Sequence, residues 1–121
     1  MGNQKLVGIL IRSSLKFNSC YWFLCWLTLQ GSPQWVSVEF EEGASLSSVS
    51  LQFQGGFCGK ECEIEINGDQ KVMDFFPEDN NRVQSFSFPE LKVDVRKVRV
   101  IFKSSSDFYG RITLYSLELY S

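Results

Sequence analysis

Short runs in which apolar and polar residues alternate recur from Trp35 onward, at intervals of roughly 8 to 12 residues. This spacing is typical of an antiparallel sandwich or barrel, in which each strand turns one face toward a core. The clearest runs are residues 36–40, 49–53, 63–66 and 85–88. No stretch after residue 35 keeps a helical period of apolar residues for three turns. We therefore predict an all-β domain.

Three further segments refine this prediction. Asn67 and Gly68 form a dipeptide that favours a hairpin turn between two such runs. In residues 93–102 the apolar phase slips across Arg96 and Lys97, which predicts a bend, a bulge or two separate strands.

The run formed by residues 111–120 has apolar residues in both phases of the alternation. Ile112 and Leu114 are expected on one face, and Tyr115, Leu117 and Leu119 on the other. Because a strand that is apolar on both faces must be covered on both, we predict that this one is central.

The first part of the chain lacks this regular alternation. We treat residues 1–31 as an atypical segment, poorly ordered or helical, and residues 32–121 as the sandwich domain. The apolar run at 20–29 is too short for a helix that crosses a bilayer, which needs about 20 residues, so no membrane span is expected. A secretory signal is the alternative, but Arg12 interrupts its apolar stretch.

Composition narrows the class of function. The formal net charge is −2 at pH 7, which gives no positive footprint for a phosphate backbone, so we expect no direct nucleic-acid partner. The chain has no histidine and therefore lacks the commonest general base and metal ligand. We predict that the protein is not an enzyme and needs no cofactor.

Four cysteines leave several states open: Cys20, Cys25, Cys58 and Cys62 could form two disulfides or a zinc site. Neither close pair has the two-residue gap of a zinc ribbon, so we interpret them as reduced thiols. A strained or redox-active bridge between Cys58 and Cys62 is the alternative.

Two segments between strands are candidate binding sites. Asp79, Asn80 and Asn81 form part of the most polar segment and could offer oxygen atoms to a cation, a sugar or a protein backbone; a solvated turn is the alternative. We also expect a turn, rather than a phosphate-binding loop, at residues 54–57, where two glycines lack the required spacing and lysine.

The second candidate is the segment that precedes the last strand. Phe108, Tyr109 and Arg111 combine two aromatic rings with a guanidinium, which suits the anchor of a protein interface. The alternative is a tight turn in which Arg111 pairs locally with Asp107 and adds little to stability.

Four stretches also carry a family resemblance: QWVSVEF at 34–40, QGGF at 54–57, DFFPEDNN at 74–81 and DFYGR at 107–111. Together they resemble a family of nuclear-receptor-associated proteins that bind testicular receptor 4. The resemblance covers residues 30–121. It implies a discoidin domain, that is, an antiparallel jelly-roll sandwich of the galactose-binding-like type. It also implies a nuclear, non-enzymatic co-regulator that represses the transcriptional activity of an orphan nuclear receptor.

The resemblance fails upstream of residue 30. Members of that family lead into Cys-Trp-Asn-Ser-Asp-Gln-Gly, whereas here Cys25 and Trp26 are followed by Leu27, Thr28 and Leu29. A replaced opening segment predicts an exposed apolar seam in the sandwich.

From these observations we predict a protein-binding module whose partner, a nuclear receptor, contacts Asp79, Asn80, Asn81, Phe108, Tyr109 and Arg111. No Leu-x-x-Leu-Leu motif is present, so a folded surface must bind. The rival hypothesis is a secreted discoidin-type module that binds carbohydrate or lipid surfaces, and it predicts a cleaved leader and paired cysteines.

Overall fold

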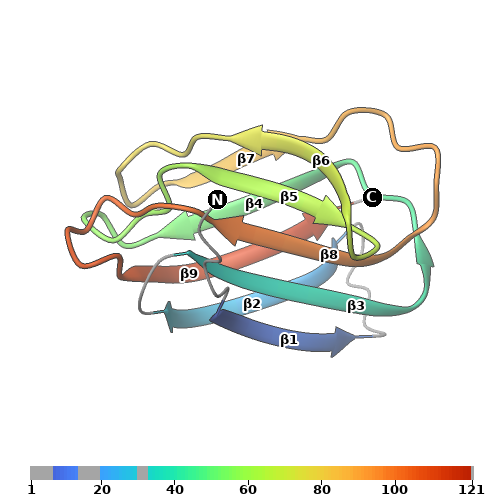
Figure 1. Ribbon diagram of the computed structural model, residues 1–121, viewed down its shortest axis with the longest axis horizontal. Helices are drawn as coiled ribbons and strands as arrows, with labels where there is room; N and C mark the ends of the chain where they lie inside the picture. The colour runs from blue at the N-terminus through green and yellow to red at the C-terminus, as the bar shows by residue number, and fades with distance from the viewer. Residues whose placement is uncertain (1–6, 14–19, 30–32, 121) are drawn as a thin grey trace.

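A computed structural model of the chain describes residues 7–13, 20–29 and 33–120, and these residues form two β-sheets packed face to face (Figure 1). All regular secondary structure in these ranges is β-strand, so the predicted all-β sandwich is confirmed. The strands are β1 Val7–Ser13, β2 Cys20–Leu29, β3 Gln34–Ala44, β4 Ser48–Phe53, β5 Cys62–Ile66, β6 Gln70–Phe75, β7 Val83–Ser87, β8 Val95–Phe102 and β9 Ile112–Tyr120.

The two sheets interleave distant parts of the chain. One has five strands in the order β1-β3-β8-β5-β6, and the other has four in the order β2-β9-β4-β7. Among the described strands, β1 and β3 pair in parallel, and the other pairs are antiparallel. Each sheet is thus built from segments that only tertiary structure brings together.

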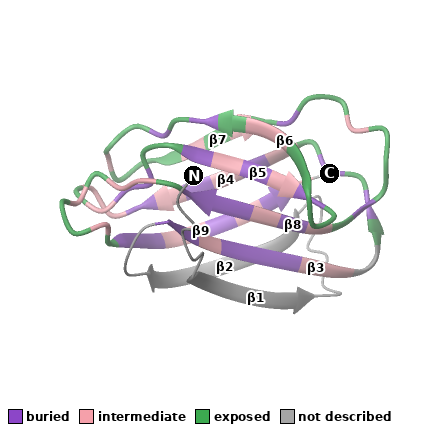
Figure 2. Cartoon of the chain, in the orientation of Figure 1, coloured by how far each residue is buried: buried purple, intermediate pink, exposed green. Residues whose placement is uncertain are grey.

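The core lies between the sheets and follows the alternation seen in the sequence (Figure 2). In β4 and β5 every second residue is buried, while the residues between them are partly exposed. Phe53 from one sheet meets Phe102 from the other edge to face, with ring centroids 5.8 Å apart. Burial of each large apolar side chain contributes about 1.5–3 kcal/mol. The core therefore holds the two sheets in one arrangement.

Strand β9 differs from the expectation in one respect. Ile112, Leu114, Leu117 and Leu119 all lie in the same core and not on opposite faces. The pairing with β4 shifts at this point, so that Tyr115 is an extra residue in β9. Because a bulge adds one residue, it returns the two apolar sets to one side of the sheet. The central position of β9, between β2 and β4, is confirmed.

The phase slip in residues 93–102 has a similar cause. Strand β8 is continuous, and Val95 and Val98 are both fully buried although they are three residues apart. Its pairing with β3 shifts between Glu39 and Ala44, so the expected bulge lies in the neighbouring strand.

The predicted hairpin between β5 and β6 is present. Asn67 and Gly68 have φ angles of 53° and 99°, the left-handed conformation that this dipeptide favours. The Asn67 side chain also accepts a bond from the Arg96 backbone N–H at 2.8 Å, and thereby ties the hairpin to β8.

The expectation of a helical or poorly ordered N-terminal segment does not fit its described residues. Val7–Ser13 and Cys20–Leu29 are strands, and they pair with β3 and β9. Without β1 and β2 the two sheets would end at β3 and β9. Backbone pairing with these strands outweighs the weak preference of the N-terminal residues for a helix or an irregular segment. The boundary at residue 31 stays a prediction, and the apolar seam concerns side chains outside the described residues.

Candidate binding site at one end of the sandwich

Three described loops meet at the same end of the sandwich, at the left of Figure 1. They are residues 54–61, 76–82 and 103–111, which follow β4, β6 and β8. The pairing register explains this placement, because Phe75 and Phe102 both lie opposite Cys62, and Phe53 lies opposite Leu114. Both predicted site segments therefore reach one end of the molecule.

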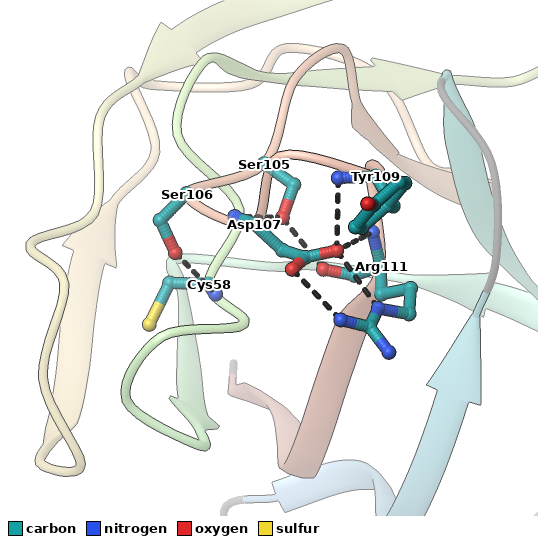
Figure 3. Close-up of polar contacts among 6 residues, drawn as sticks. All are labelled: Cys58, Ser105, Ser106, Asp107, Tyr109 and Arg111. Carbon is teal, nitrogen blue, oxygen red and sulfur yellow. Dashed lines mark hydrogen bonds and ion pairs between the residues drawn. The ribbon is translucent and has the colours of Figure 1, made fainter.

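Loop 103–111 is organised around one carboxylate (Figure 3). Asp107 accepts bonds from the Arg111 side chain at 2.9 and 3.1 Å, from the Arg111 backbone N–H at 3.0 Å and from the Tyr109 backbone N–H at 3.2 Å. The guanidinium beside it lowers the pKa of Asp107 to about 2. The acid is thus ionised at neutral pH, and the loop holds its own shape.

Ser105 closes the base of the same loop. Its hydroxyl donates to the Arg111 carbonyl at 2.6 Å and accepts from the Asp107 backbone N–H at 3.0 Å. Because the hydroxyl acts as donor and acceptor at once, it fixes both sides of the turn.

The loop leaves its two aromatic rings in solvent. Phe108 is 92% exposed and Tyr109 is 74% exposed, and the rings meet edge to face with centroids 5.2 Å apart. The Arg111 guanidinium lies over the Phe57 ring at 5.2 Å and over the Tyr109 ring at 5.6 Å. The local pairing of Arg111 with Asp107, which the sequence analysis gave as the alternative, is therefore present. It belongs to the same loop that leaves the Phe108 and Tyr109 rings in solvent.

The polar loop 76–82 uses its side chains differently. Asp79 accepts a bond from the Gly56 N–H at 2.7 Å, and Asn81 accepts one from the Gly55 N–H at 2.6 Å. The bond from Gly56 is the main cause of the lowered pKa of Asp79. Asn80 accepts from the Arg82 N–H within its own turn. The oxygen atoms expected to meet a ligand therefore bind the protein's own backbone.

Residues 54–57 form the predicted turn and join the two loops. The Phe57 N–H donates to the Gln54 carbonyl at 2.9 Å, and Gly56 has a φ of 90°. One side of this turn binds Asp79 and Asn81, and the other places the Phe57 ring beneath Arg111. The two candidate segments are thus connected through a third.

Beneath the loops lies a residue whose structural role the sequence analysis missed. Cys58 is buried, and its N–H donates to the Ser106 hydroxyl at 3.0 Å while its carbonyl accepts from the Ser106 N–H at 2.9 Å (Figure 3). Its thiol points at the Asn80 carbonyl, 3.6 Å away. Three loops therefore converge on Cys58. A local sequence signal for this role does not exist, because these contacts are with distant segments.

Cys58 and Cys62 are both free thiols, as predicted for this pair; the side chains of Cys20 and Cys25 lie outside the described residues. Burial raises the pKa of Cys58 to about 11, and burial raises that of Cys62 further. Since the thiolate is the nucleophile, a raised pKa lowers the reactivity of both thiols at neutral pH.

The described residues show no group of three or more His, Cys, Asp or Glu side chains that could hold a metal ion. Nor do they include a helix with the length and apolarity to cross a membrane. What this end of the sandwich offers is a rigid loop with exposed aromatic rings, a surface suited to holding another molecule.

No protein-family model matches the chain. Among curated proteins it is similar to several that are called nuclear receptor 2C2-associated protein. The one from Danio rerio is 38% identical over 96% of this chain and 88% of its own length. The one from Homo sapiens is 36% identical over the same shares. The one from Xenopus tropicalis is 48% identical over 78% of this chain and 71% of its own length.

Among solved structures the chain is similar to the family 32 carbohydrate-binding module of C. perfringens NanJ in complex with galactose, with a TM-score of 0.63, 21% identity, and coverage of 74% of this chain and 67% of that one. A chitosan-binding module from Paenibacillus sp. IK-5 gives a TM-score of 0.60, 18% identity, and coverage of 78% and 76%. At these identities the likeness concerns the fold, which is of the galactose-binding type.

Proposed function

The chain belongs to the family of nuclear receptor 2C2-associated proteins, and we propose on this premise that it is a non-enzymatic nuclear module that binds nuclear receptor 2C2 and represses its transcriptional activity. The receptor is the partner that the relatives' name gives. The proposed contact surface is the loop end of the sandwich, with Phe108, Tyr109 and Arg111 at its centre.

One observation carries the proposal: a loop held by four bonds to Asp107 exposes two large rings to solvent. Exposed aromatic side chains next to an arginine are the residues that most often dominate protein interfaces. Because the loop is already fixed, binding does not have to order it, and the free energy of burying the rings appears as affinity.

Asp79, Asn80 and Asn81 form the proposed rim of this surface. The oxygens of Asp79 and Asn81 hold the turn at residues 54–57, on which the Arg111 side chain rests through Phe57. The contribution of this rim to binding is therefore expected to be smaller than that of the rings, since much of it acts through loop position.

The rival function, a secreted carbohydrate- or lipid-surface module, predicts paired cysteines. Cys58 and Cys62 are free and buried, which favours the receptor proposal. The two functions also differ in ligand, so one experiment can address both.

The test is titration of the receptor's purified ligand-binding domain with the full chain, by calorimetry. We expect the double variant Phe108→Ala and Tyr109→Ala to lose at least about 30-fold in affinity, the effect of removing an interface hot spot of about 2 kcal/mol. Its melting temperature should stay unchanged, because both rings are exposed.

The matched control is Val93→Ala, which truncates another exposed apolar residue, 46% exposed, in the loop before β8 at the opposite end. It should bind the receptor as the parent does. Equal affinity of the double variant and the parent would place the receptor elsewhere on the surface. Binding of galactose or anionic vesicles, with none of the receptor, would contradict the proposed function in favour of its rival.

A further inference from the structure

Strand β7 is the last strand of the four-stranded sheet, and one of its sides pairs with β4. The backbone N–H of Phe88 donates to the Ser47 carbonyl at 2.8 Å. Since an antiparallel strand directs alternate residues to either side, Phe86 and Gln84 also bond toward β4, and the backbone groups of Val83, Ser85 and Ser87 point away from it.

These outward groups have no hydrogen bond to any part of the chain that the structure describes. Val83, Ser85 and Ser87 are all exposed, and Val83 is 61% exposed. The strand therefore presents an open, regular edge of alternating donors and acceptors.

The corresponding edge strand of the other sheet, β6, has features that prevent pairing with a further strand. Strand β6 carries Lys71 and Asp74, which pair with each other at 3.0 Å, and its pairing with β5 is interrupted by a register shift. Charged side chains and irregular pairing are the usual means by which sheet edges avoid further strands. Strand β7 has no charged residue, no proline and no register shift in its pairing with β4. This difference indicates that the edge at β7 is left open for pairing.

We propose that β7 pairs antiparallel with β7 of a second copy of this chain, about a two-fold axis at Ser85. In that register Ser85 lies opposite Ser85 of the other copy, and Val83 lies opposite Ser87. This is the register that uses all three outward-pointing residues at once, and it joins two four-stranded sheets into one of eight strands. The two edges that meet carry small, uncharged side chains on the solvent side of the sheet, namely Val83, Ser85 and Ser87.

Charge at the ends of β7 supports a second copy as the occupant. Arg82 precedes the strand and Glu90 follows it, and both are exposed, with no side-chain ion pair to any residue in the described ranges. In the proposed register Arg82 of one copy lies opposite Phe88 of the other, two residues from Glu90, so the two opposite charges come to the same end, and the symmetry repeats this approach. A partner of unrelated sequence would not be expected to match both ends.

The interface depends on a strand of five residues. It is therefore smaller than a standard stable interface, and the dimer should be in equilibrium with the monomer. Analytical ultracentrifugation of the full chain over a wide concentration range is the test, and the average mass of the parent should rise toward that of a dimer.

The key variant is Ser85→Pro, which removes one outward N–H and no backbone bond to β4. It also removes the 2.7 Å bond between the Ser85 and Ser50 hydroxyls, a loss that it shares with the control Ser85→Ala. We expect it to stay monomeric, whereas Ser85→Ala, which keeps the N–H, should dimerise like the parent. Circular dichroism checks that both variants fold. A parent that remains monomeric at every concentration, or a Ser85→Pro variant that dimerises normally, would overturn the proposal.

Charge reversal gives a second readout if Ser85→Pro does not fold. Arg82→Glu and Glu90→Arg should each weaken the dimer about fivefold, from two lost charge pairs. The double variant should restore the parent's affinity, since each copy then supplies the reversed partner. Failure of the double variant to recover would contradict pairing between two copies, and a hetero-complex through β7 would be the remaining occupant. None of these outcomes depends on receptor binding.

Discussion

The two loops that hold the predicted site residues differ in what their polar side chains bind. In loop 76–82, Asp79 and Asn81 bind the backbone of a neighbouring loop. In loop 103–111, Asp107 binds its own loop and so lifts Phe108 and Tyr109 into solvent. The difference teaches that a polar segment can serve as the support, while the surface free to bind another molecule is aromatic.

The largest loss of stability is expected in loop 54–61, which contacts both of the other loops. Gly59 forms a bridge to Ser105, and a Cβ at Gly59 would lie 2.8 Å from both the Cys62 Sγ and the Phe102 Cδ1. We expect Gly59→Ala to lower the free energy of unfolding by about 1–3 kcal/mol, because buried neighbours must shift. Urea unfolding measures this.

Gly68→Ala is a useful control for that variant. Gly68 has a φ of 99°, and a Cβ added there would meet nothing within 4 Å, so its cost is backbone strain alone, about 1 kcal/mol. A Gly59→Ala protein as stable as the parent would show that the floor beneath the loops is loosely packed.

A smaller loss of stability should distinguish the supporting loop 76–82 from the aromatic contact surface. Asn81→Ala leaves the Gly55 N–H without its acceptor and should cost about 1 kcal/mol of stability. Receptor affinity should fall less than for the double variant at Phe108 and Tyr109, whose stability should not change. Thermal melts and calorimetry of the same preparations test this crossover. If Asn81→Ala loses affinity and keeps its melting temperature, the polar loop is itself the contact surface.

The smallest expected effect is on the stability of the fold at low pH. The pKa of Asp107 is lowered from 3.8 to about 2, so its ionised form stabilises the fold above pH 4, and that stabilisation is lost as the pH falls toward 2. Asp107→Asn should therefore be less stable than the parent at neutral pH, and the gap should narrow between pH 4 and pH 2. Melting temperatures across this range measure the gap. A constant gap would mean that Asp107 is not paired with Arg111 in solution.

Much of the fold was predictable from residue 35 onward, because alternation is a local signal. Residues 49–53 and 63–66 read as half-buried strands and lie in β4 and β5. The hairpin at Asn67 was equally predictable, since the left-handed backbone conformation is a property of the dipeptide itself.

What the sequence could not show depends on distant partners. Tyr115 looks like a member of a second apolar face, and only the pairing of β9 with β4 makes it a bulge. Asp79 and Asn81 look available, and only the approach of Gly55 and Gly56 occupies their oxygens. The six predicted residues do lie at one end of the sandwich, whereas their role in binding stays a prediction.

The strand order has a consequence for how the protein is made. Strand β9 consists of residues 112–120 and lies between β2 and β4, which are synthesised far earlier. Until β9 has left the ribosome, these two early strands have no common neighbour. Folding of the four-stranded sheet therefore has to wait for β9, and pairings between such remote segments are slow to form. During that interval β2 and β4 lack their shared partner, and their apolar residues are open to non-native pairing.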